Sequence, residues 1–239
     1  MTPLVLVHGF LGGGAQWQGQ VDAFGATRDV IAVDLPGFGA NAHLSALDTI
    51  VGFAEYVIER LSGLGVERYH LLGHSMGGMI VQDMARRDAG RVDQLILYAT
   101  GATGVLPGRF ETIQESKDRA VQDGPKPTAR RIAATWFLDR DSAPGFEPCA
   151  TIAEQASLDA IYAGLDAMEA WSGADKLPAI SQDTLVIWSQ GDRSYGWPQI
   201  EQLWTSIPNC SLAVVPGCAH AIHLEKPDLF NAVLVDFLR

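Results

Sequence analysis

A serine framed by glycines, in the segment Gly-His-Ser-Met-Gly-Gly at residues 73–78, restricts the fold of this chain most strongly. An apolar run that begins at Tyr69 leads into this segment, and apolar residues at helical spacing follow it from Met79. This order predicts a strand, a sharp turn and a helix, with Ser75 at the tip, as in a G-x-S-x-G nucleophile elbow. So tight a turn strains the serine backbone, and glycines two positions away on either side avoid a clash. The alternative interpretation is a glycine-rich turn with a serine by chance, and the flanking strand and helix and the catalytic partners elsewhere in the chain argue against it.

Length and composition suit one large α/β domain, or a core with a sizeable insertion. The 239 residues are 47% hydrophobic, and 17 basic against 28 acidic side chains give a net charge of −11. This charge argues against nucleic acid or an anionic membrane as a partner. The three cysteines, Cys149, Cys210 and Cys218, are widely spaced without a C-x-x-C pair, so neither a disulfide framework nor a zinc site is predicted. No apolar run reaches about 18 residues and no signal peptide is evident, so we expect a cytoplasmic protein.

Strand-like and helix-like segments alternate along most of the chain. Short aliphatic runs predict buried strands near residues 4–7, 30–33, 69–72, 93–99, 184–188 and 211–215. The clearest amphipathic helix runs from Ile50 to Leu61, and Ser45 with Asp48 resembles its capping box. Alternation of this kind predicts right-handed βαβ units and a mostly parallel, doubly wound sheet of about six strands flanked by helices.

The pattern changes between residues 101 and 181. Six of the twelve prolines lie there, so no helix can run long, and apolar residues recur at short intervals. We expect several short helices that form a cap inserted into a core made of residues 1–100 and 182–239. Trp136, Phe137 and Tyr162 are candidate substrate-binding residues, although about half of the cap aromatics would only pack the cap onto the core.

Ser75 needs a base to take its proton, and the base needs an anion to fix its tautomer. In an open α/β sheet these groups lie beyond the carboxyl ends of strands. Asp192 and His220 each follow such an end, in the order Ser, Asp, His. His223 competes with His220, but it lies where the last helix approaches and is expected to be structural.

Two backbone N–H groups should stabilise the oxyanion of an acyl-transfer reaction. We expect these to come from Met76, after the nucleophile, and Phe10, in the loop after the first strand. The glycines at 12–14 fit neither a P-loop nor a dinucleotide fingerprint. No cofactor and no metal are therefore expected.

These motifs together resemble the α/β-hydrolase superfamily, in its single-domain, carboxylesterase-like branch with a helical cap. The resemblance rests on residues 8–10, 34–39 and 73–78, on the Asp192 turn, and on His220 with residues 225–227 behind it. Three features depart from the family pattern. The family usually has two antiparallel strands before the first strand, whereas here we expect six parallel strands and a trimmed N-terminal edge. Ser189 replaces a glycine in the acid turn, and Ala40 and Asn41 follow Gly39 where the family often has a serine.

The resemblance implies a serine hydrolase that cleaves a small to medium carboxylic ester through an acyl-enzyme on Ser75. An enol-lactone hydrolase, a C–C bond hydrolase or a lyase of the same fold is the alternative. The C–C hydrolases often carry Asn before the serine and Trp after the histidine, where this chain has His74 and Ala221. A non-catalytic ligand receptor is a third hypothesis. Substrate identity and oligomeric state are left open.

Overall fold

The computed structural model describes residues 1–239 and is built on one six-stranded, all-parallel sheet in the order β2-β1-β3-β4-β5-β6. The strands are β1 (Leu4–Val7), β2 (Val30–Val33), β3 (Tyr69–His74), β4 (Val92–Tyr98), β5 (Asp183–Trp188) and β6 (Cys210–Val214). The chain moves outward from β1 to β2 and then returns to β3 on the other side of β1. The predicted doubly wound sheet of about six strands is confirmed.

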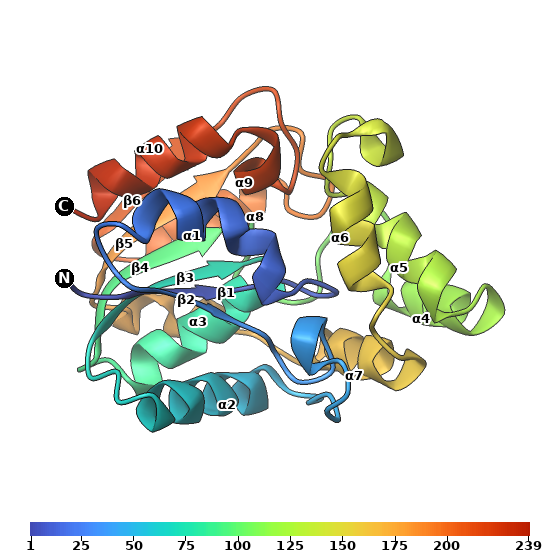
Figure 1. The fold of residues 1–239 in the computed structure, drawn as a ribbon, viewed down its shortest axis with the longest axis horizontal. Coiled ribbons are helices and arrows are strands. Elements are labelled where there is room, and N and C mark those ends of the chain that lie inside the picture. Colours follow the sequence, from blue (N-terminus) through green and yellow to red (C-terminus); the bar gives the residue numbers. More distant parts are fainter.

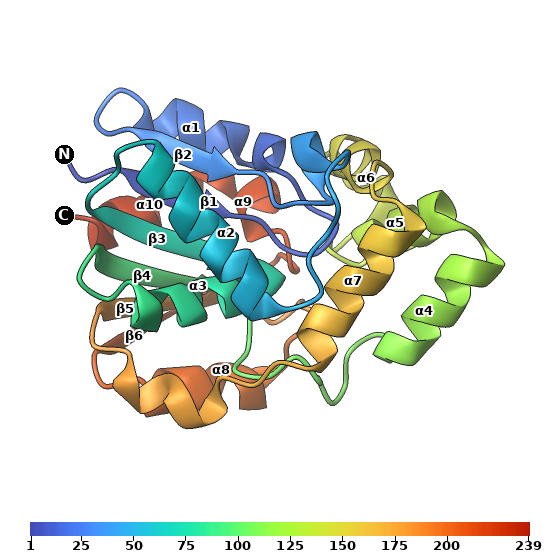
Figure 2. The same ribbon diagram turned by 90° about the horizontal axis from the view of Figure 1, so that it is seen from below.

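Helices cover both faces of the sheet (Figures 1 and 2). Successive strand side chains point to opposite faces, so Leu71 and Leu95 join one hydrophobic core while Leu72 and Ile96 join another. The first core includes α2 (Ile50–Gly63), α3 (Met76–Arg87) and α8 (Trp197–Ser206). The second includes α1 (Gln18–Phe24) and α10 (Pro227–Phe237). A short 3-10 helix, Gly14–Trp17, precedes α1.

The cap of α2 differs from the sequence expectation. The helix begins at Ile50, and the hydroxyl of Thr49 accepts a hydrogen bond from the Gly52 amide at 3.1 Å. Ser45 and Asp48 lie in the preceding loop, so the expected capping box is wrong. Ile50 is the first buried apolar residue of the helix, and its burial sets where the first turn begins.

Four short helices lie between β4 and β5, beyond the carboxyl ends of the strands (Figures 1 and 2). They are α4 (Ile113–Gln122), α5 (Pro125–Ala134), α6 (Phe146–Ala153) and α7 (Leu158–Glu169). Lys117 links α4 to α7 through ion pairs with Asp166 at 2.6 Å and Glu169 at 2.9 Å. Their apolar side chains join the larger core, so these helices pack directly onto the sheet domain.

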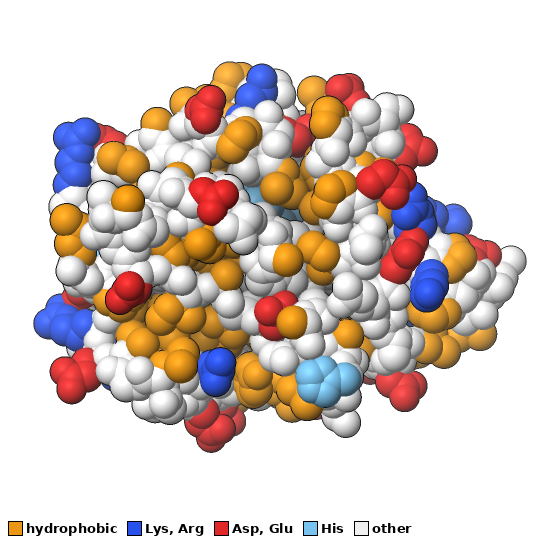
Figure 3. All heavy atoms as spheres, in the orientation of Figure 1, with side chains coloured by type: hydrophobic (Ala, Val, Ile, Leu, Met, Phe, Trp, Pro, Cys, Tyr) orange, Lys and Arg blue, Asp and Glu red, His pale blue; other side chains and the backbone are white.

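Acidic and basic side chains are interspersed on the face shown in Figure 3, with apolar areas between them, the most extensive toward the lower left of the view. None of the helices combines the length and the apolar character that crossing a membrane requires.

Candidate active site

Ser75 occupies the sharp turn between β3 and α3 with φ of 56° and ψ of −118°. Positive φ is uncommon for a residue with a side chain. The two framing glycines are required by close packing, because a Cβ on Gly73 would lie 2.3 Å from the Gly77 carbonyl oxygen. A Cβ on Gly77 would lie 2.4 Å from the Val7 carbonyl oxygen. The strained elbow expected from the sequence is therefore present.

Asp192, just after β5, holds the imidazole of His220 in the loop after β6. Nδ1 of His220 lies 2.9 Å from Oδ2 of Asp192, and the two side chains are 3% and 0% exposed. Oδ1 of Asp192 accepts from the amides of Ser194 at 2.7 Å and Tyr195 at 3.2 Å. A carboxylate held by three donors directs Nδ1–H of His220 toward itself and leaves Nε2 free to accept a proton.

The backbone of His220 is fixed by two neighbours on β3 and β4. Its carbonyl accepts from Nε2 of His74 at 3.1 Å and from the hydroxyl of Tyr98 at 2.9 Å. Burial lowers the pKa of His74 well below its usual range, so this ring is neutral. The Tyr195 ring stacks on the His220 imidazole, with centroids 5.8 Å apart.

His223, the rival histidine, lies behind this cluster and does not line the cavity above Ser75. Its Nδ1 is 3.0 Å from the Tyr98 hydroxyl. Burial lowers the pKa of His223 to about 3, so the ring stays neutral. This placement away from the cavity fits the structural role that the sequence predicts.

Two side chains tie the His220 loop to its surroundings. The Ser189 hydroxyl lies 2.7 Å from the carbonyl oxygen of Ala219, so this serine links the acid turn to the histidine loop. Glu225, in the short helix α9 (Ile222–Glu225), accepts from the Ala219 amide at 2.7 Å. Its other carboxylate oxygen accepts from the Leu138 amide at 2.8 Å, in the segment after α5. The base is thus anchored from the sheet side and the cap side.

The two expected oxyanion donors lie beside the serine. The Phe10 amide makes no hydrogen bond within the protein. Met76 is the first residue of α3, where helix N–H groups lack intrahelical acceptors. The loop after β1 packs tightly here, since a Cβ on Gly9 would lie 2.9 Å from the Ser75 Cβ. Nδ1 of His8 donates to the Gly9 carbonyl at 2.8 Å and supports this loop.

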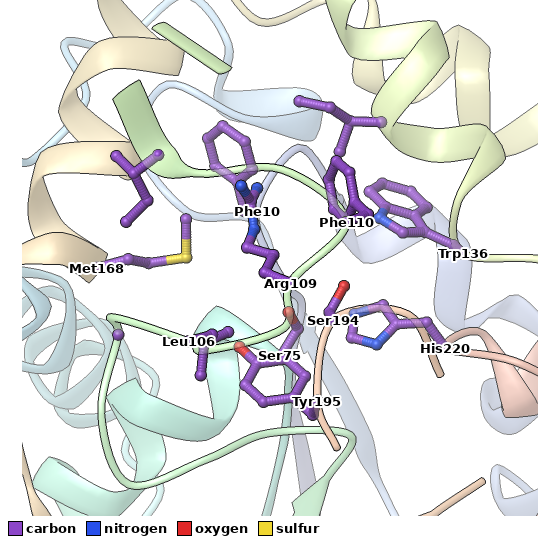
Figure 4. Close-up of a pocket in the computed structure, with 13 residues that line it drawn as sticks. Phe10, Ser75, Leu106, Arg109, Phe110, Trp136, Met168, Ser194, Tyr195 and His220 are labelled. Carbon is purple, nitrogen blue, oxygen red and sulfur yellow. The ribbon is translucent and has the colours of Figure 1, made fainter. Parts of the chain in front are cut away.

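A cavity between the carboxyl edge of the sheet and helices α4, α5 and α7 is lined by both Ser75 and His220 (Figure 4). Trp136 lines it, as expected for a substrate-binding residue. The other lining residues are Phe10, Gly104, Leu106, Arg109, Phe110, Ile113, Ile132, Met168, Ser194 and Tyr195.

Phe137 and Tyr162 do not line this cavity, which corrects the sequence expectation. Phe137 is completely buried and packs against Gly145, where an added Cβ would lie 3.0 Å from its ring. The Tyr162 hydroxyl points to the Lys117 carbonyl at 3.4 Å. Neighbouring residues on a short helix or its end face different directions, and sequence alone does not give that rotation.

Sequence reasoning missed Tyr195 and Arg109, which both line the cavity. Burial raises the pKa of Tyr195 to about 12, against a smaller opposing effect of the Ser75 hydroxyl. The position of Tyr195 three residues after Asp192 could have indicated that it lies near the site. No sequence feature indicated Arg109. No three His, Cys, Asp or Glu side chains are grouped so as to hold a metal ion.

Comparison with known proteins agrees with this architecture. The model of the Alpha/beta hydrolase family matches residues 4–233. The chain is 28% identical to pimeloyl-acyl-carrier-protein methyl ester esterase of Vibrio atlanticus, over 98% of this chain and 93% of that protein. It is 41% identical to the dihydrolipoyllysine-residue acetyltransferase component of the acetoin cleaving system of Pseudomonas putida, over 100% of this chain and 64% of that protein. The thermophilic esterase from Thermogutta terrifontis, solved with malate bound, superposes with a TM-score of 0.89 at 26% identity, covering 100% and 90% of the two chains.

Proposed function

The chain belongs to the alpha/beta hydrolase family, and we propose that this hydrolase cleaves a small to medium carboxylic ester through an acyl-enzyme on Ser75. One observation carries the proposal. The Asp192–His220 hydrogen bond of 2.9 Å is buried, and His220 lines the same cavity as a serine on a strained elbow. A base oriented by a buried carboxylate, in the same cavity as a half-buried serine, is the arrangement that acyl transfer needs.

In the proposed reaction, Nε2 of His220 takes the proton of the Ser75 hydroxyl as Oγ attacks the ester carbonyl. The carbonyl oxygen becomes an anion facing the amides of Phe10 and Met76. The C–O bond of the ester then breaks, and the alcohol leaves with the proton held by His220. Water, deprotonated by the same histidine, attacks the acyl-enzyme and releases the acid and free Ser75.

We also propose that the segment 101–181 acts as a cap that selects the substrate. Its residues Phe110, Ile132, Trp136 and Met168 supply apolar walls to the cavity. Apolar walls of this kind suit the carbon chain or ring of an ester. The methyl ester esterase among the relatives supports this substrate class.

Active-site labelling tests the proposal directly. The purified protein is treated with a fluorophosphonate probe, the modified peptide is mapped by mass spectrometry, and hydrolysis of p-nitrophenyl esters from acetate to laurate is measured. We expect the label on Ser75 and a maximum of kcat/KM at one chain length. Ser75→Ala should abolish labelling and lower kcat by about 10⁶-fold.

Ser194→Ala is the matched control, because Ser194 lines the same cavity but does not lie on the strained turn between β3 and α3. In the Ser194→Ala variant, the fluorophosphonate label should still map to Ser75. A label on Ser75 without turnover of any ester would redirect the proposal to lactone or C–C bond hydrolysis. The absence of any label would contradict the triad and favour a ligand receptor.

A further inference from the structure

Arg109 places a guanidinium in the same cavity as Ser75 and His220. Figure 4 shows its side chain running from near Ser75 toward the cap, so the charged end lies away from the nucleophile. Nη1 donates to the Glu111 carbonyl oxygen at 2.8 Å and to the Ser116 hydroxyl at 3.2 Å. The Phe110 ring lies 4.4 Å from the guanidinium carbon. The group is held in place from two sides.

The charge of Arg109 has no carboxylate partner within the protein. Glu111 is the nearest acid along the chain, but Arg131 binds both of its oxygens, at 2.6 and 3.1 Å. Arg119 approaches the same carboxylate at 3.6 Å. Arg119 and Arg131 therefore occupy the Glu111 carboxylate, and Arg109, the one arginine that lines the cavity, forms no ion pair with it.

The free edge of the guanidinium has the geometry of a carboxylate receptor. Nε and Nη2 of Arg109 make no hydrogen bond within the protein, whereas Nη1 makes two. Two parallel N–H groups on one edge bind both oxygens of a carboxylate. Burial lowers the pKa of Arg109, yet a guanidinium stays protonated in proteins. Arg109 is half-buried and neither Nε nor Nη2 is fully enclosed, so an anionic ligand that enters the cavity can reach both atoms.

We propose that the substrate carries a carboxylate, separate from the ester being cleaved, and that Arg109 binds it. This inference rests on the proposed ester hydrolysis and narrows it to monoesters of dicarboxylic acids or to esters of carboxylate-bearing alcohols. The apolar wall between Ser75 and the guanidinium accommodates the carbon chain that joins the ester to the carboxylate. Arg109 is a specificity-determining residue, with no role in bond breaking.

Matched ester pairs test this assignment. In the first pair the acyl part is changed, from p-nitrophenyl hydrogen adipate to the neutral p-nitrophenyl methyl adipate. In the second pair the alcohol part is changed, from 4-carboxyphenyl butyrate to the neutral 4-carbamoylphenyl butyrate. The readout is the ratio of kcat/KM for the charged ester to that for its neutral partner, measured in the wild type and in Arg109→Leu.

We expect Arg109→Leu to lower this ratio about 10- to 100-fold, the range for a hydrogen bond to a charged group. The pair that shows the fall identifies which side of the ester bears the carboxylate. Arg119→Leu is the matched control, because Arg119 also neighbours Glu111 but does not line the cavity. It should leave the ratio unchanged.

If the ratio of kcat/KM for the charged ester to that for the neutral ester is the same in wild type and Arg109→Leu for both pairs, the carboxylate proposal is overturned. Ester hydrolysis would still stand. If no ester is turned over, calorimetric titration with adipate and with dimethyl adipate still tests whether Arg109 binds a carboxylate. Binding of adipate alone, lost in Arg109→Leu, supports the carboxylate site. Equal binding of both compounds, or of neither, overturns it.

Discussion

The proposed chemistry depends on which of two histidines, three positions apart, faces the nucleophile. His220 hydrogen-bonds to Asp192 and lines the cavity, whereas His223 contacts Tyr98 behind it. We expect His220→Asn to lower kcat for a p-nitrophenyl ester by about 10⁴- to 10⁶-fold, because an amide cannot act as a base. His223→Asn should lower kcat less than about 10-fold.

The same substitution at both positions makes the comparison a matched one. An asparagine at 223 keeps a polar group that can hydrogen-bond to the Tyr98 hydroxyl, which lies 3.0 Å from Nδ1 of the histidine. Circular dichroism and thermal unfolding check that both variants are folded. A loss of activity in His223→Asn as large as that in His220→Asn would contradict the assignment of the base.

The elbow between β3 and α3 gives a prediction about packing. A Cβ on Gly77 would lie 2.4 Å from the Val7 carbonyl oxygen, and rigid backbone cannot yield. Gly77→Ala should therefore lower the free energy of unfolding by about 3 kcal/mol or more, measured by guanidinium titration. Gly90→Ala is the control, since no atom lies within 4 Å of its added Cβ. Equal stability of the two variants would show that the elbow is not tightly packed.

Glu225 connects the histidine loop to Leu138, in the segment after α5. Its two oxygens accept from the amides of Ala219 and Leu138. In Glu225→Gln one of these amides meets an NH₂ group, so we expect about 1–3 kcal/mol less stability. The loosened loop should lower kcat severalfold with little change in KM.

Glu201→Gln on α8 is the control, because Glu201 is exposed and makes no side-chain hydrogen bond. Thermal unfolding and ester kinetics on both variants provide the measurement. A rise in KM with unchanged kcat in Glu225→Gln would mean that Glu225 shapes the substrate site and does not position the base.

The sheet could be predicted from the sequence because continuous aliphatic runs mark strands buried on both faces. The elbow and the order Ser75, Asp192, His220 were also predictable, since each residue follows a strand whose carboxyl end meets the same sheet edge. Trp136 lines the cavity, whereas Phe137 and Tyr162 do not. Their directions depend on how short cap helices rotate against the sheet, and local sequence does not determine that rotation.

Arg109 shows a second limit of sequence reasoning. It lies in the irregular segment between β4 and α4, where no periodicity marks a face. Arg109 lacks a carboxylate partner because Arg131 binds the Glu111 carboxylate, and these two residues are 20 positions apart in the sequence. Unpaired charge is a property of the folded arrangement and cannot be read from a composition with an acidic excess.

Buried histidines predict how the stability of the folded chain depends on pH. Burial lowers the pKa of His223 to about 3 in the folded state, against 6.5 for a solvated imidazole. Between these values the unfolded chain binds a proton that the folded chain does not. The free energy of unfolding therefore falls as the pH decreases below about 6.5, by about 1.4 kcal/mol per pH unit for this group. The pKa values of His8 and His74 are lowered by burial too, so they act in the same direction.

His223→Asn removes one of these titrations while keeping a polar group that can hydrogen-bond to Tyr98. Guanidinium titrations at pH 8 and pH 5 give the loss of stability for each protein. The loss should be smaller in the variant by about 2 kcal/mol, the value for one group followed 1.5 units below its unfolded pKa. Comparing losses, rather than stabilities at one pH, cancels the packing defect that the smaller side chain introduces at both pH values. Equal losses in the two proteins would mean that His223 takes up a proton in the folded state, and its neutral, buried position would then be wrong.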